Sequence, residues 1–147
     1  MNYQLDRISY EIGMVNCFIE MVACGMKPLA ISPPLEPENL PLMEEVSREL
    51  SEGFGTKCCT VDSLMITDIQ SAEFTRGKHS ILYYKDDAVI ARYRELDAEV
   101  AALTAKGEYS GRRRWEISFE FGKMLGYPDD VVLEKVNSGG KIDPVTL

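Results

Sequence analysis

Apolar residues recur at helical spacing through the first part of the chain, over roughly residues 4–24. The apolar positions are Leu5, Ile8, Ile12, Met14, Val15, Cys17, Phe18, Ile19, Met21 and Val22. The positions between them form a narrow polar strip of Arg7, Glu11, Asn16 and Glu20. A helix that is apolar over most of its circumference must be covered on several sides. The pattern therefore predicts a helix that is either central to the domain or packed against a second copy of the chain.

Three short apolar runs, at residues 29–32, 56–61 and 80–84, predict strands. A helix is expected between the first two strands, because Asn39 can cap it and Pro41 suits its first turn. The apolar stripe of this helix would be Met43, Val46, Leu50 and Phe54. A strand–helix–strand unit implies a parallel crossover. We therefore predict an α/β fold with a small, mostly parallel sheet of about three strands, packed by the N-terminal helix and by C-terminal helices.

The clearest helical pattern covers residues 87–106, which Asp86 can cap. Its apolar positions repeat at 4-3-4-3 spacing: Val89, Tyr93, Leu96, Val100 and Leu103. Two further helices are expected, over residues 111–125 and, after Pro128, in a last short segment. The segment 62–79 is polar and weakly patterned, and it is the longest predicted loop. The length of 147 residues suits a single domain, which we place at residues 1–138, with a flexible tail at 139–147.

The net charge of −8 is unevenly distributed. All of it falls in residues 1–75, whereas residues 76–147 are neutral. An acidic front half repels phosphate backbones and anionic lipid. No signal peptide is visible, and no apolar run is long enough to span a bilayer, so a cytoplasmic location without membrane contact is expected. The spacing of the four cysteines favours reduced thiols over disulfides.

Polar residues follow the predicted strands, and they form the first candidate site. In open parallel sheets, ligands bind beyond the carboxyl ends of the strands. Those ends carry Ser32, then Asp62 and Ser63, then Lys85. Together with His79 they could offer hydroxyl, carboxylate, imidazole and ammonium groups to a small polar ligand. The alternative is that they are only turn and cap residues, since Ser and Asp are favoured at such positions.

The adjacent thiols of Cys58 and Cys59, with His79 as the single histidine, are the second candidate. A nucleophilic cysteine needs a neighbouring base, and strand geometry would let only one of the two thiols meet His79. The alternative is that both are small buried hydrophobic residues. There is no transition-metal motif, and a carboxylate site of Asp62 and Asp68 is formally open but not required by their spacing. No cofactor is identified.

A basic run, Arg112-Arg113-Arg114 beside Trp115, is the third candidate. It lies at a predicted helix N-terminus, where positive charge is mildly unfavourable. It could contact an anion or a partner, pair with the acidic front half of the chain, or simply be solvated. The helices that follow, over residues 117–136, have a helix-turn-helix layout. The second of them begins with Asp129 and Asp130, which disfavours entry into a DNA groove.

Two segments carry a resemblance to known sequences. The residues EISFEFGKMLGYPDDVV, from Glu116 to Val132, and the run Met26-Lys27-Pro28-Leu29-Ala30 resemble segments of uncharacterised prokaryotic cytosolic proteins of unknown function. The resemblance implies no activity.

The sequence thus predicts a small-ligand-binding or assembly module that forms a homodimer with the first helix at or near the contact. The first alternative is an enzyme of unknown type using Asp62, His79 or a cysteine. The second alternative is a DNA-binding protein of the helix-turn-helix kind.

Overall fold

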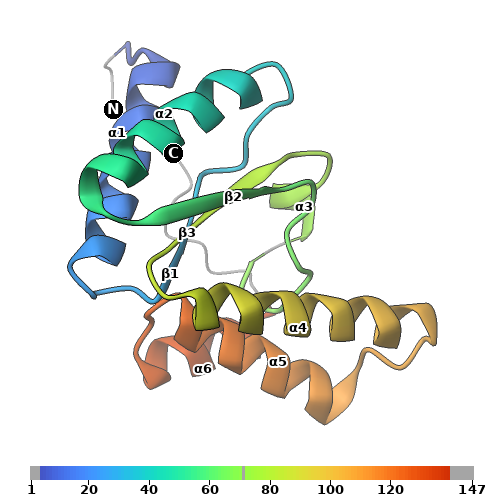
Figure 1. Cartoon of the computed structure of the whole chain (residues 1–147). Helices are drawn as coiled ribbons and strands as arrows, with labels where there is room; N and C mark the ends of the chain where they lie inside the picture. Colours follow the sequence, from blue (N-terminus) through green and yellow to red (C-terminus); the bar gives the residue numbers. More distant parts are fainter. Residues whose placement is uncertain (1–3, 71, 140–147) are drawn as a thin grey trace.

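The computed structural model describes residues 4–70 and 72–139, and its elements form three layers with a small sheet in the middle (Figure 1). In chain order the elements are α1 (Arg7–Ala23), β1 (Leu29–Ile31), α2 (Leu40–Phe54), β2 (Lys57–Val61), α3 (Ala72–Thr75), β3 (Ser80–Tyr84), α4 (Asp87–Ala105), α5 (Gly111–Met124) and α6 (Asp129–Asn137). Helices α1 and α2 cover one face of the sheet, and α4, α5 and α6 cover the other. The predicted α/β class and the three strands are confirmed. The predicted tail falls, apart from Gly139, outside the described residues.

The prediction of a mostly parallel sheet is wrong. The strand order is β1-β3-β2, and β3 is antiparallel to both neighbours. Strands β1 and β2 do run in the same direction, as a crossover through α2 requires, but β3 lies between them. The reason is that β3 is the most completely buried of the three strands, since all five of its residues are buried. The central position covers such a strand on both faces and both edges, whereas the ends of the sheet suit the shorter β1 and the partly exposed β2.

Strand β3 divides the core into two clusters because its side chains alternate between the faces. Ile81 and Tyr83 join α1 and α2, while Leu82 and Tyr84 join α4, α5 and α6. The loop after β2 closes the second cluster, since Leu64 and Ile69 are buried in it. The segment predicted as the longest loop therefore contributes to the core as well as containing the short helix α3.

Helix α1 is a surface helix with one buried stripe. Its buried apolar residues are Val15, Ile19 and Val22, whereas Ile8 and Tyr10 are exposed and Met14 is half-buried. Of the two predicted alternatives, the central helix is wrong, because only the sheet-facing side is covered. Packing of this helix against a second copy stays a prediction. Glu11, predicted on the polar strip, is buried and accepts a hydrogen bond from Arg7 at 2.9 Å. Within the described part of the chain, no helix is long and apolar enough to cross a membrane.

Helix α2 contacts the sheet through a stripe that differs from the predicted one. Met43, Ser47 and Ser51 are buried, whereas Phe54 is exposed. Serines allow the helix backbone to approach the sheet closely, and the hydroxyl of Ser47 is hydrogen-bonded to the hydroxyl of Tyr83 at 2.8 Å. Burial raises the pKa of Tyr83, so this phenol stays protonated. A buried tyrosine on β3 therefore selects the helix face that carries a polar partner.

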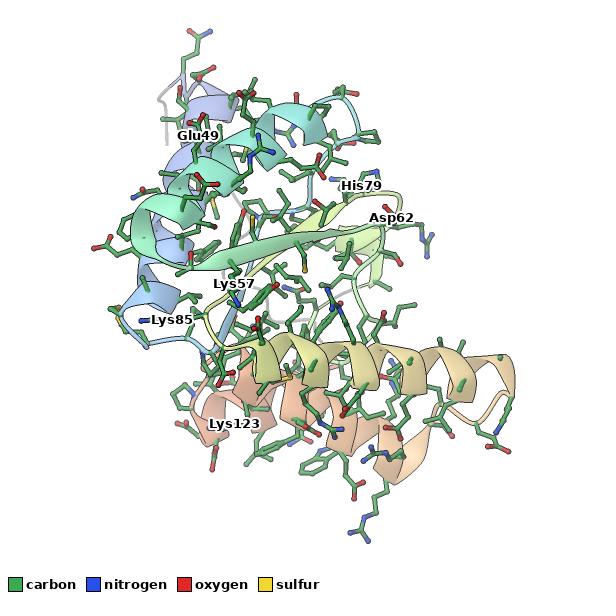
Figure 2. The ribbon with its side chains drawn as sticks, in the orientation of Figure 1. Glu49, Lys57, Asp62, His79, Lys85 and Lys123 are labelled. Carbon is green, nitrogen blue, oxygen red and sulfur yellow. The ribbon has the colours of Figure 1, made fainter. Side chains whose placement is uncertain are left out.

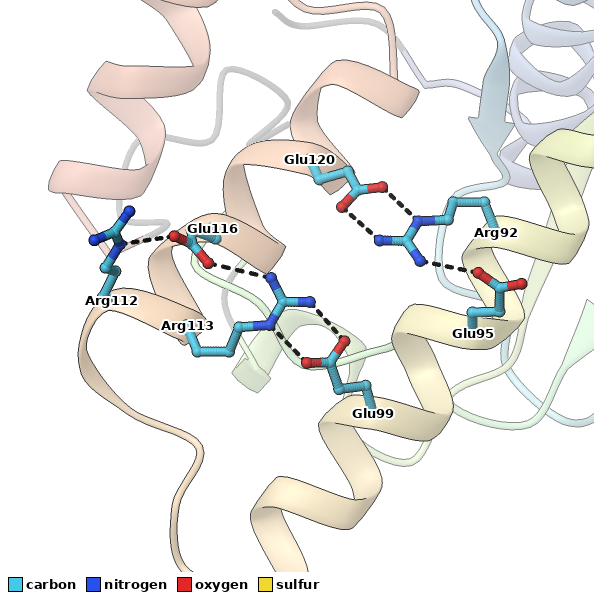
Figure 3. Close-up of polar contacts among 7 residues, drawn as sticks. All are labelled: Arg92, Glu95, Glu99, Arg112, Arg113, Glu116 and Glu120. Atoms are coloured by element: carbon cyan, nitrogen blue, oxygen red, sulfur yellow. Dashed lines mark hydrogen bonds and ion pairs between the residues drawn. The ribbon is translucent and has the colours of Figure 1, made fainter.

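Helices α4 and α5 form a hairpin joined by paired ions (Figure 3). The buried positions of α4 are Ile90, Tyr93, Leu96 and Val100, close to the predicted stripe. Asp86 caps α4 as predicted, because its carboxylate accepts from the Ala88 amide at 2.9 Å. Across the hairpin, Arg92 binds Glu120 through two N–H donors, at 2.6 and 3.0 Å.

Candidate functional site

The predicted strand-end residues do not all meet, because the sheet is antiparallel. Asp62 and His79 lie together at one end of the strands, and Lys85 lies at the opposite end (Figure 2). There the ammonium of Lys85 donates to the Ala23 carbonyl at 3.4 Å. Ser32 is at the same end as Asp62, but its hydroxyl is occupied: it accepts from the Ile81 amide and donates to the Pro33 carbonyl, both at 2.9 Å.

Asp62 and His79 form a loose pair in which the carboxylate is exposed and the imidazole is partly buried. The Asp62 Oδ1 atom lies 3.5 Å from His79 Nδ1, and the Asp62 side chain is 97% exposed. Ser63 beside them is exposed as well. An exposed carboxylate at this distance holds the imidazole weakly. This geometry gives no activated base, and a catalytic role for the pair stays a prediction.

Cys58 and Cys59 point to opposite faces of β2, as strand geometry predicts. Cys58 packs against the α1/α2 cluster and Cys59 against the α4–α6 cluster. Burial raises the pKa of both thiols, with smaller opposing effects from Arg48 and Arg94, respectively. Raised pKa values keep the thiols protonated at neutral pH, and a protonated thiol is a poor nucleophile.

The basic run is engaged by carboxylates of the same chain. Arg112 binds Glu116, and Arg113 binds both Glu116 and Glu99 (Figure 3). Arg114 binds Asp68, which belongs to the acidic front half, with its shortest contact at 2.7 Å. The sequence had left open whether the basic run pairs with the acidic front half of the chain, and Arg114 does so through Asp68. A contact of the run with an anion or a partner stays a prediction.

An apolar groove lies elsewhere, between α1, the segment that follows β1, and α3. Its outer chamber has a volume of about 360 Å³. The apolar and aromatic residues lining this chamber are Leu5, Tyr10, Met14, Pro33, Pro34 and Phe74, and its charged lining residues are Arg7, Lys78 and the buried Glu11. Leu5 is 59% exposed and Phe74 is 37% exposed, so large apolar side chains face solvent here. An exposed apolar patch with a polar rim is typical of a binding surface.

A smaller inner chamber of about 120 Å³ continues the groove, sharing Met14, Pro33 and Phe74 with the outer one. The carboxamide oxygen of Gln70 is buried at this chamber and has no hydrogen-bond partner within the described residues. A buried acceptor that is left unpaired costs about 1–3 kcal/mol. Within the described residues the Ser51 hydroxyl and His79 Nδ1 are also buried without a hydrogen-bond partner, and of the three residues only Gln70 lines the groove.

Lys27 supplies the second polar group of the inner chamber. Its ammonium donates to the Leu125 carbonyl at 2.7 Å and lies 5.0 Å from the centre of the Tyr127 ring. Burial lowers the pKa of Lys27. An ammonium has three donors, so one bonded carbonyl leaves donors available for a ligand.

The inner chamber is built where the two segments that carry the sequence resemblance meet. Lys27 belongs to the first segment, and Leu125 and Tyr127 belong to the second. Gly126 between them has a φ of +79°, and a Cβ atom at this position would lie 3.0 Å from the Met26 carbonyl oxygen. The close approach of the two backbones therefore requires a glycine here.

The groove is lined by both apolar and polar side chains. Its polar lining residues include Arg7, Tyr10, Glu11, Lys27, Ser32, Gln70 and Lys78, and within the part of the chain that the structure describes its lining includes no Cys or His. The described residues contain no group of three or more His, Cys, Asp or Glu side chains that could hold a metal ion.

Sequence reasoning found only Ser32 among the groove residues, because the groove is assembled from four separate parts of the chain. The one available signal was the excess of apolar side chains on the first helix. Comparisons with protein-family models, with curated proteins and with solved structures find no match.

Proposed function

We propose that this chain is a non-catalytic binding protein that takes a small amphipathic molecule into the groove beside α1. The observation that carries the proposal is an exposed apolar groove that also presents the Lys27 ammonium and the Gln70 carboxamide, whose oxygen has no hydrogen-bond partner within the described residues. A cytoplasmic location is part of the proposal, and the free state of all four cysteines supports it.

The lining defines the chemistry of the ligand. An apolar body would lie against Met14, Pro33 and Phe74, which line both chambers. Its polar end would donate a hydrogen bond to Gln70 and accept one from Lys27, as an amide, or a hydroxyl beside a carbonyl, can. Groups of this kind fix the orientation of a ligand, while the apolar walls supply most of the affinity.

The proposal is tested by titrating the protein with 8-anilinonaphthalene-1-sulfonate and following the dye's fluorescence. This probe has an aromatic body, an N–H donor and an anionic group, so it matches the groove. We expect saturable binding at one site. Gln70→Leu should weaken binding about 3- to 10-fold, because one hydrogen bond is lost. Phe74→Ser should weaken it further, because an apolar wall is removed.

Leu133→Ser is the matched control, since Leu133 on α6 is 39% exposed and does not line the groove. Circular dichroism spectra should show that all variants are folded. The proposal is overturned if the folded protein binds no dye saturably, or if Leu133→Ser weakens binding as much as Phe74→Ser.

A further inference from the structure

Strand β2 is an edge strand whose outer backbone groups can be identified from the hydrogen bonds of β3. The Ser32 amide donates to the Ile81 carbonyl, so the backbone groups of Ile81 point toward β1. Because these groups alternate in direction along a strand, those of Ser80, Leu82 and Tyr84 point toward β2. Their partners there are Val61, Cys59 and Lys57.

The backbone N–H and C=O groups of the two remaining β2 residues, Cys58 and Thr60, therefore point away from the sheet. An exposed strand edge of this kind is a template for another strand. The surface beside it is hollowed by about 380 Å³, between β2 and the α2 residues Glu44 and Arg48. Figure 1 shows β2 at the open side of the sheet, with α2 on one flank and α4 on the other.

Glu44 and Arg48 of α2 carry opposite charges and lie beside different residues of this strand edge. Thr60 donates a hydrogen bond to Glu44 at 2.6 Å, so the carboxylate of Glu44 stands at the level of Thr60. Arg48 lies one helical turn after Glu44 on α2, about 6 Å along the helix axis. Because the chain reverses direction between α2 and β2, this step leads from the level of Thr60 to that of Cys58, and Arg48 and Cys58 line the same hollow. Within the described part of the chain, Arg48 has no carboxylate partner at ion-pair distance.

From these positions we propose that β2 pairs with β2 of a second copy, antiparallel and with the two-fold axis at Cys59. In this register Cys58 of each copy faces Thr60 of the other, and each such pair exchanges two N–H···O bonds. Glu44 of one copy then faces Arg48 of the other. A centre at Cys58 would oppose two Arg48 side chains, and a centre at Thr60 would oppose two Glu44 side chains. Like charges that face each other in this way are destabilising. The charges therefore favour a two-fold axis at Cys59.

The proposed register makes a distinctive prediction for the thiols. The two copies of Cys59 form the central non-hydrogen-bonded pair, with Cα atoms about 4.5 Å apart. That separation is within disulfide reach. The two copies of Cys58 are diagonal neighbours, about 7–8 Å apart, and lie beyond easy reach. Cys58 and Cys59 are therefore expected to differ in forming a disulfide between the two copies, although they are neighbours of similar burial.

The first test uses two variants that each keep a single thiol on β2, with Cys17 and Cys24 replaced by Ser in both. One keeps Cys59 and carries Cys58→Ser, and the other keeps Cys58 and carries Cys59→Ser. Diamide is the oxidant: it takes two electrons and two protons from two thiols and is reduced to the hydrazine as the S–S bond forms. We expect a covalent dimer from the Cys59 protein and at least tenfold less from the Cys58 protein. The proposed register is overturned if the two proteins cross-link equally, or if the Cys58 protein cross-links more than the Cys59 protein. It is also overturned if the Cys59 protein forms no covalent dimer.

The second test measures the molar mass of the full chain by sedimentation equilibrium over a series of concentrations. Thr60→Pro removes an N–H that points out of the sheet, so it should leave the pairing of β2 with β3 intact and weaken dimerisation at least tenfold. Thr60→Val is the control, because it loses the hydroxyl bond to Glu44 but keeps the N–H. A one-chain mass at every concentration, or a dimer equally stable in Thr60→Pro, overturns the proposal. Neither result bears on the groove, which shares no lining residue with this edge.

Discussion

The two faces of the sheet are covered in different ways. On the α4–α6 side, a large apolar cluster is framed by ion pairs that link separate elements: Arg92 with Glu120, Arg113 with Glu99, and Arg114 with Asp68. On the α1/α2 side the cluster is smaller, and no ion pair joins α1 to α2 within the described residues.

The groove and the hollow beside β2 both involve the α1/α2 side. The comparison indicates that the surfaces suited to binding lie on the side where no ion pair links the two covering helices within the described residues.

The largest expected effect is the loss of a core aromatic ring on the α4–α6 side. Phe121 is fully buried and contacts Tyr93, with ring centres 6.0 Å apart. Phe121→Ala should lower the free energy of unfolding by about 3–5 kcal/mol, because it leaves a cavity. Urea denaturation followed by the fluorescence of Trp115 measures this loss. Phe54→Ala on α2 is the control: this ring is 37% exposed, and the loss should stay below about 1 kcal/mol.

Replacing one glycine on each side of the sheet by alanine should change the stability in opposite directions. A Cβ atom on Gly122 would lie 2.8 Å from Val132 Cγ1 and 2.9 Å from Ile69 Cδ1, whereas one on Gly13 of α1 would meet nothing within 4 Å. Gly122→Ala should therefore destabilise the protein by about 1–3 kcal/mol through overpacking. Gly13→Ala should stabilise it by about 0.4–1 kcal/mol, because alanine favours the helix. Thermal denaturation of both variants provides the measurement, and effects of equal sign would contradict the proposed difference in packing.

Alkaline pH should lower the free energy of unfolding, because the phenol of Tyr93 is buried in the α4–α6 cluster and resists ionisation there. Burial raises the pKa of Tyr93 from 10.0 to about 12, so the folded state favours the neutral phenol. The resulting stabilisation is fully present below pH 10 and is lost as the pH rises from 10 to about 12, because the unfolded chain ionises first. Tyr93→Phe should remove this part of the pH dependence, about 1–3 kcal/mol at the upper end. Urea denaturation of both proteins at pH 9 to 12 tests it, and parallel loss in the two proteins would contradict it.

The smallest expected effect concerns the ion pairs of the hairpin. Arg113 and Glu99 are each partly exposed, at 40% and 35% of the side chain, so screening limits their contribution. Arg113→Gln should cost about 0.5–1 kcal/mol at low salt and less at 1 M salt. Arg76→Gln is the control, since Arg76 is exposed and has no ion-pair partner within the described residues. A cost for Arg113→Gln that does not depend on salt would indicate lost packing instead.

Local patterns in the sequence were enough to predict most of the elements. The 4-3-4-3 spacing of α4 and its Asp86 cap were predicted correctly, because helix periodicity and capping involve only residues a few positions apart. The opposite orientation of Cys58 and Cys59 also follows from strand geometry alone. The sequence alone also determined the chain's acidic front half and the presence of three short strands.

Only the tertiary structure decided the direction of β3, because strand pairing depends on which segments bury each other over long separations. That choice moved Lys85 away from Asp62 and left one edge of β2 open. It also decided that Ser47 faces Tyr83, that the Gln70 side-chain oxygen is buried with no partner among the described residues, and that four separate parts of the chain form one groove. Each of these features depends on contacts between residues far apart in sequence, which a local pattern of apolar and polar positions does not record.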